Sequence, residues 1–263
     1  MTMLLYYVLL ASVFVFGAVI GSFLNVCIYR IPAGESIVTP GSRCPECGTA
    51  IRWHQNVPIL SYLALGGKCA GCKASISIRY PLVEALTGFI FMLVFFHFSI
   101  HPATLVYWLF GAALIVITFI DVDHQIIPDV ISLPGILIGF ICSFAIPWIS
   151  WVDSLLGIVV GGGSLFLVAA AYELLTKKEG MGGGDIKFLA MIGAFLGWKA
   201  VLPIIFISSL LGSLVGVPLM FIRKADGKLA IPFGPFLAAG ALFYLFWGPP
   251  LIRWYLSFFA GDL

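Results

Sequence analysis

The chain has 263 residues, of which 61% are hydrophobic and only 10% are charged. Soluble domains carry about a quarter charged residues, so this composition excludes an ordinary water-soluble globular protein. The net charge of +2 is small, so the positions of the basic residues are more informative than their sum. We predict an all-α integral membrane protein that is surrounded by the lipid bilayer and has no nucleic-acid partner.

Eight predominantly apolar segments are expected to be transmembrane helices, because lipid requires each segment to satisfy its own backbone hydrogen bonds. They are residues 4–28, 82–100, 103–120, 130–149, 154–174, 187–198, 200–222 and 232–247. The first segment, 4–28, is too long for the apolar region of a signal peptide and has no basic residues before it. We therefore expect it to remain in the mature protein as a transmembrane helix. Pairs such as Gly157/Gly161 and Gly193/Gly197 predict close helix packing.

The basic residues predict the orientation of these spans. Twelve of the fourteen Lys and Arg residues lie in or beside the loops that follow the first, third, fifth and seventh spans. Only Lys199 and Arg253 fall on the opposite side. By the positive-inside rule, the basic loops are cytoplasmic and both termini lie outside.

The loop 30–80 contains two Cys-x-x-Cys pairs, CPEC and CAGC, separated by 21 residues. This spacing is typical of a tetrahedral zinc site on two tight turns, for which Gly48 and Gly71 are suitable residues. Disulfides are an alternative, but the loop is assigned to the reducing cytoplasm, and an iron–sulfur cluster is a weaker one. We predict a structural zinc ion that folds the loop. Its ligands would be Cys44, Cys47, Cys69 and Cys72.

Two short cytoplasmic loops carry acidic residues at span boundaries. Asp121 lies at the exit of the third span, and Asp185 lies before the sixth span. Two carboxylates that approach closely cannot both ionise easily, so one retains a proton. The charged member could then activate water while the protonated member donates to a carbonyl oxygen. This is the chemistry of aspartic peptide hydrolysis.

Three glycines precede the second acid, and without side chains they would let an extended substrate backbone approach its carboxylate. They are Gly182, Gly183 and Gly184. The alternative is a flexible turn in which Asp185 is favoured by a helix dipole. Asp129, which follows Pro128, is expected to cap the fourth span.

The apolar segment 187–198 is short, because it covers only about 20 Å of a hydrocarbon core of about 30 Å. Either the outer loop dips inward, or the glycine loop lies below the cytoplasmic surface. In the second case Asp185 would lie at membrane depth, where ionisable groups usually line functional cavities.

Four motifs in this order resemble the type IV prepilin peptidases, the bifunctional leader peptidase/N-methyltransferases of bacterial inner membranes. They are GSFLNVCIYRIP at 21–32, the paired CPEC and CAGC, IDVDHQIIPD at 120–129 and GMGGGDIK. The resemblance covers nearly the whole chain. It implies that Asp121 and Asp185, the latter within Gly-x-Gly-Asp, are the catalytic aspartates.

The resemblance also implies a reaction. Family members cleave the basic leader of type IV prepilins or type II secretion pseudopilins after a glycine, on the cytoplasmic side. They then methylate the new N-terminal residue with S-adenosylmethionine. We find no glycine-rich strand–helix signature for that donor in the sequence.

Two other functions remain as alternatives. One is a Gly-x-Gly-Asp protease that cuts within transmembrane helices, and the other is a proton or cation transporter. On the favoured interpretation, the chain divides into a first transmembrane helix at 1–29, a zinc-binding loop domain at 30–80 and a membrane-embedded peptidase domain at 81–263.

Overall fold

The computed structural model describes residues 3–177, 182–223 and 231–257. Within these ranges the secondary structure is helical, apart from two isolated β-bridges. The helices are α1 Met3–Arg30, η1 Trp53–Gln55, α2 Leu60–Ala64, α3 Arg79–Phe98, α4 Pro102–His124, α5 Asp129–Cys142, η2 Ser143–Ala145, α6 Trp151–Thr176, α7 Gly183–Leu196, α8 Trp198–Arg223 and α9 Gly234–Ser257. Lys178, Lys224 and Lys228, which contribute to the predicted orientation, lie outside the described residues.

A helix corresponds to each of the eight expected spans. Six are long and apolar enough to cross a membrane: α1, α3, α4, α6, α8 and α9. The other two, α5 and α7, have 14 residues each. The protein is therefore a multi-pass membrane protein, as predicted. The expected span 130–149 is wrong at its end, because the Ser143 hydroxyl donates to the Phe140 carbonyl where α5 gives way to a 3-10 turn.

The chain forms two compact units, Met1–Val116 and Ile117–Leu263. The three-part division predicted from the sequence stays a prediction. In the first unit α1 packs closely on α3, since a Cβ at Gly17 would lie 2.8 Å from the Gly88 Cα. Trp108 stacks on Phe91, with ring centroids 5.1 Å apart, and closes the apolar cluster between these helices.

In the second unit, α7 is the central helix. It contacts α5, α6, α8 and α9, and all nine residues from Phe188 to Leu196 are buried. The contact with α6 is close enough that a Cβ on Gly193 would collide with the Gly157 carbonyl oxygen. The predicted close packing of these glycine pairs is confirmed. The short apolar segment is therefore surrounded by the protein's own helices.

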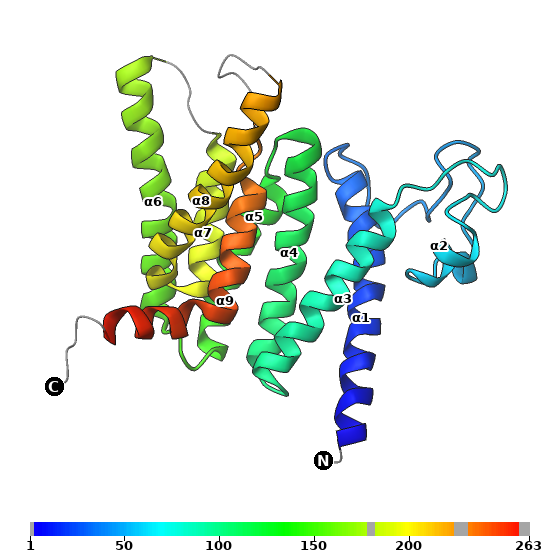
Figure 1. The fold of residues 1–263 in the computed structure, drawn as a ribbon, viewed down its shortest axis with the longest axis horizontal. Coiled ribbons are helices and arrows are strands. Elements are labelled where there is room, and N and C mark those ends of the chain that lie inside the picture. Colours follow the sequence, from blue (N-terminus) through cyan, green and yellow to red (C-terminus); the bar gives the residue numbers. More distant parts are fainter. Residues whose placement is uncertain (1–2, 178–181, 224–230, 258–263) are drawn as a thin grey trace. The chain divides into compact units, whose positions relative to one another are not determined.

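The candidate site lies at one end of this second unit. Figure 1 shows the C-terminal ends of α6 and α8 at the same end of the unit as the N-terminal ends of α7 and α9. The second half of α9 turns aside, and Pro249 and Pro250 lie in that part of the helix. The end where α7 and α9 begin holds the candidate site described next.

Candidate active site and metal centre

The first candidate acid lies near the C-terminal end of α4. The Asp121 side chain is buried, with 5% of its surface exposed. Its Oδ2 atom accepts a hydrogen bond of 2.9 Å from the backbone N–H of Gly234. Gly234 is the first residue of α9, so α4 and α9 together position this carboxylate.

The second candidate acid, Asp185, lies in the first turn of α7, outside the six candidate spans. Burial raises the pKa of Asp185 to about 6, and the negative charge of Asp121 adds to the rise. The two carboxylates therefore lie close enough to repel each other. Their arrangement fits the sequence-based hypothesis of a pair that shares a proton.

The three glycines before Asp185 differ in their surroundings. A Cβ at Gly182 or Gly183 would meet no atom of the described residues within 4 Å. A Cβ at Gly184 would lie 2.9 Å from the Ile127 Cβ. Gly184 therefore lets α7 approach the loop that follows α4, while no described residue fills the space beside Gly182 and Gly183.

An ion pair near Asp185 joins α7 to α5. The Lys187 ammonium donates to both carboxylate oxygens of Asp129, at 2.7 and 2.8 Å. The expectation that Asp129 caps α5 is wrong, because Pro128 is the N-cap and Asp129 begins the helix. The sequence could not reveal this role, since the partners are 58 residues apart.

The four cysteines of the loop 30–80 converge. Their Sγ atoms all lie within 4.8 Å of one another, and those of Cys44 and Cys72 are 3.8 Å apart. In a tetrahedral site with zinc–sulfur bonds of about 2.3 Å, the sulfur atoms would be about 3.8 Å apart. The cluster could therefore hold a metal ion, as the spacing of the cysteines predicts.

Two similar turns present these thiols. The N–H groups of Cys44 and Cys69 donate to the carbonyls of Thr49 and Ala74, respectively. The residue after each Cys-x-x-Cys pair has a positive φ, 68° at Gly48 and 64° at Lys73. Gly48 thus meets its expectation, but Lys73 rather than Gly71 takes the left-handed position in the second turn.

The thiols of the cluster differ in their acidity. A hydrogen bond with the Thr49 hydroxyl lowers the pKa of the Cys47 thiol to about 6, whereas the pKa of the Cys72 thiol is raised to about 11 beside the other cysteines. Zinc binds thiolates rather than thiols, so of these two cysteines only Cys47 is favoured in the form that a metal needs.

A buried acid of α3 fastens the cysteine-rich loop to the membrane helices. Glu84 is 8% exposed, and its Oε2 atom accepts a 2.7 Å hydrogen bond from the Ile59 N–H. Ile59 has a positive φ of 62°, which a β-branched residue rarely adopts. This tertiary contact therefore holds a strained point of the loop, and no local sequence signal indicated it.

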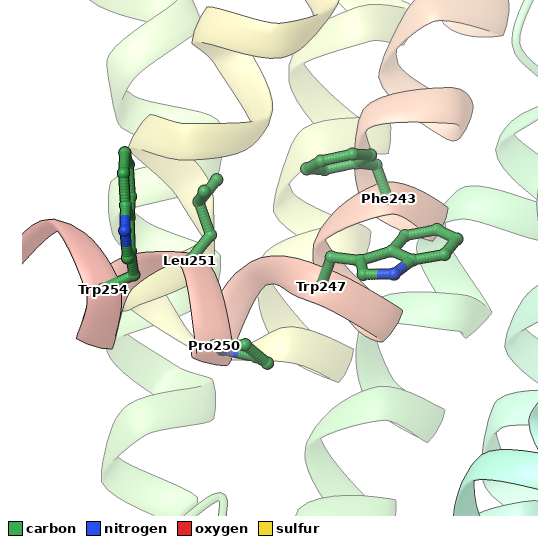
Figure 2. Close-up of a pocket in the computed structure, with 5 residues that line it drawn as sticks. All are labelled: Phe243, Trp247, Pro250, Leu251 and Trp254. Carbon is green, nitrogen blue, oxygen red and sulfur yellow. The ribbon is translucent and has the colours of Figure 1, made fainter.

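An apolar groove lies elsewhere, along α9 between Phe243 and Trp254. Figure 2 shows its lining of aromatic, proline and leucine side chains. They are Phe243, Trp247, Pro250, Leu251 and Trp254. None of these residues is titratable, so the groove offers no acid–base chemistry.

Fold and site together define a helical multi-pass membrane protein with a paired-carboxylate site and a four-cysteine metal-binding cluster. Residues 15–98 match the family model described as Bacterial Peptidase A24 N-terminal domain, and residues 108–217 match the one described as Type IV leader peptidase family. The chain belongs to this family of type IV prepilin leader peptidase/N-methyltransferases, which are bifunctional enzymes. The family expected from the four motifs is thereby confirmed.

Relatives named prepilin leader peptidase/N-methyltransferase come from several bacteria. The chain is 40% identical to that of Pseudomonas aeruginosa, with 92% of this chain and 91% of the relative covered. It is 42% identical to that of Neisseria gonorrhoeae, with 85% of each covered. It is 39% identical to that of Myxococcus xanthus, with 81% of this chain and 64% of the relative covered. No solved structure matches the chain.

Proposed function

We propose that the chain removes the leader of type IV prepilins or type II secretion pseudopilins after a glycine, with Asp121 and Asp185 as catalytic residues. The observation that carries this proposal is the placement of the two carboxylates: Asp121 is buried on α4, and Asp185 lies in the first turn of α7, near enough for the charge of Asp121 to add to its raised pKa. In the proposed reaction, the ionised carboxylate takes a proton from water. The protonated carboxylate donates to the oxygen of the scissile carbonyl.

The open side of the glycines at the start of α7 supports a path for the substrate. The described residues leave space at Gly182 and Gly183 on the side where a Cβ would point. An extended peptide could therefore approach Asp185 closely. Gly184 lies in the same first turn of α7, and it has in addition the packing contact with Ile127.

A cleavage assay on a purified prepilin in detergent tests this assignment. Asp121→Asn and Asp185→Asn should each abolish leader removal without unfolding the protein, because an amide neither activates water nor holds the shared proton. Asp123→Asn is the matched control, since Asp123 is exposed on the same helix, and it should retain cleavage. Cleavage within the transmembrane part of the pilin, or full activity of either Asn variant, would contradict the proposal.

We further propose that a second reaction follows, in which the new N-terminal residue is methylated with S-adenosylmethionine. The family name and the sequence motifs support this step. Mass spectrometry of the cleaved pilin should detect the added methyl group only when S-adenosylmethionine is supplied. Methylation should persist in Asp185→Asn when a pilin that already lacks its leader is offered.

For the cysteine cluster we propose one structural zinc ion. It would be held by Cys44, Cys47, Cys69 and Cys72, whose sulfur spacing fits tetrahedral thiolate coordination. This site would fold a loop that has little apolar core of its own. The alternatives of disulfides or an iron–sulfur cluster are addressed by the metal measurement that follows.

The paired variant Cys44→Ser, Cys47→Ser tests the metal and its role. The zinc content should fall from about one per chain to near zero, and proteolysis of the loop 30–80 should become faster. Leader cleavage should slow but persist, unlike in the aspartate variants. Cys142→Ser, at a cysteine outside the cluster, should keep its zinc. Unchanged zinc in the paired variant would contradict the assignment.

A further inference from the structure

A buried backbone donor faces the candidate site from the start of α9. The Gly234 N–H group donates to Asp121 Oδ2 across 113 residues of sequence. N–H groups in the first turn of a helix have no partner within the helix. The next residue, Pro235, has no N–H group, so Gly234 supplies the donor at this position.

The close approach requires glycine. A Cβ at position 234 would lie 2.7 Å from Asp121 Oδ2 and 3.2 Å from its Cγ. The turn cannot easily shift away, because the Phe233 carbonyl accepts hydrogen bonds from the N–H groups of Phe236 and Leu237. Any larger residue would therefore displace the carboxylate or the start of α9.

The two carboxylates of the site differ in the hydrogen bonds that they accept. Asp121 accepts a hydrogen bond from a group that can only donate, which favours an ionised oxygen at that position. In the part of the chain that the structure describes, no hydrogen bond reaches the Asp185 carboxylate. Since two neighbouring carboxylates do not both ionise easily, the shared proton is favoured on the acid without the donor.

We propose that Gly234 is a positioning residue of the peptidase reaction. Its N–H group orients Asp121 and selects it as the ionised member that activates water, while Asp185 carries the proton. This inference rests on the proposed function of the two aspartates as a catalytic pair. It assigns a role to the PFGP segment at 232–235, which no sequence motif had indicated.

Gly234→Ala is the first test, in steady-state cleavage of a prepilin. We expect kcat to fall about 10- to 100-fold with little change in KM, as for loss of a hydrogen bond to a charged group. The acidic limb of the pH profile should move to higher pH, which a purely structural defect would not cause. Gly240→Ala is the matched control on the same helix, since its Cβ would lie 2.7 Å from the Ser208 Oγ. It should keep the wild-type pH profile.

A second variant removes the donor without adding atoms. Incorporation of hydroxyacetic acid at position 234 replaces the N–H by an ester oxygen, and it should reproduce the loss of kcat and the shift of the acidic limb. Wild-type kcat and pH profile in the ester variant, with Asp121→Asn inactive, would overturn this inference alone. Full cleavage by Asp121→Asn would instead overturn the proposed function, and this inference with it.

Discussion

At the scale of single residues, the two carboxylates of the site have different surroundings. Asp121 is buried and accepts a backbone N–H, whereas Asp185 lies half-buried at the start of α7. An isolated aspartate has a pKa of about 4. With its pKa raised to about 6, Asp185 keeps its proton to higher pH than usual and loses it as the pH rises through about 6.

This shift predicts the pH dependence of cleavage. If the active pair carries one proton on Asp185, kcat/KM should be greatest near or below pH 6 and decline by about tenfold per unit above that range. Assays from pH 5 to pH 9 (about one unit apart) with a soluble prepilin fragment would measure this limb. Asp123→Asn should give the same profile, and unfolding should be excluded at each pH. Constant activity through this range would contradict the need for the proton.

At the scale of the helices, glycines set the distance between α6 and α7. Gly157 and Gly193 contact each other through their backbones, and a Cβ on either would overlap the backbone of the other helix. In contrast, a Cβ added to Gly163 on α6 would meet no described atom within 4 Å. A Cβ at Gly161 would lie 2.6 Å from the Leu189 carbonyl oxygen, so the triple glycine at 161–163 contains both a constrained and an unconstrained position.

A pair of substitutions tests this difference. Gly193→Ala should lower the unfolding free energy by about 1–3 kcal/mol or more, because the helices must move apart. Gly163→Ala should raise it by up to about 1 kcal/mol, since alanine favours a helix over glycine. Thermal unfolding in detergent would compare the two. Equal effects would show that the glycines do not set the helix distance.

The ion pair between Lys187 and Asp129 connects α7 to α5 near the site. Their side chains are 38% and 55% exposed, so the pair should contribute no more than about 1 kcal/mol to stability. Its effect on α7 should be larger in catalysis than in unfolding. Lys187→Met and Asp129→Asn should each lower leader cleavage by up to about tenfold, less than the aspartate variants do.

The double variant Lys187→Asp, Asp129→Lys exchanges the two charged side chains. It separates the effect of losing the ion pair from the effect of changing either side chain. It should recover part of the activity that the single substitutions lose, because the two charges would again attract each other. Cleavage rates of the wild type, Lys187→Asp, Asp129→Lys and the exchanged protein form a double-mutant cycle. Additive losses, with no recovery in the exchanged protein, would show that the pair does not act as a unit.

At the scale of the whole molecule, six long apolar helices make the chain a multi-pass membrane protein, and α5 and α7 complete the eight expected helices. The asymmetry of Lys and Arg supports our proposal for its orientation in a bacterial inner membrane. The loop 30–80 and the ends of α4 and α6 would be cytoplasmic, and both termini would lie outside.

Fusions to the C-terminus of the full chain test this orientation. With an even number of crossings and an outside N-terminus, alkaline phosphatase at the C-terminus should be active and green fluorescent protein should be dark. A fusion after residue 78, in the loop 30–80, should give the opposite result. Fluorescence from the C-terminal fusion would contradict the predicted orientation.

The sequence by itself determined the membrane class, the presence and order of the eight expected helices and the convergence of the four cysteines, although α5 ends at Cys142 and α9 at Ser257 rather than at 149 and 247. These features depend on composition, apolar length and local spacing, which the chain carries in short segments. It also marked Asp121 and Asp185 as candidates, since acids are rare in so apolar a chain.

Only the tertiary structure decided which groups surround those acids. The Gly234 N–H on Asp121, the Asp129 partner of Lys187 and the Ile59 N–H on Glu84 each join residues far apart in the chain. A backbone N–H has the same chemistry at almost every residue, so no local pattern reveals which one will face a carboxylate. Helix packing makes that choice for Asp121 and Lys187 where α4, α5, α7 and α9 meet, and the contact of the loop 30–80 with α3 makes it for Glu84.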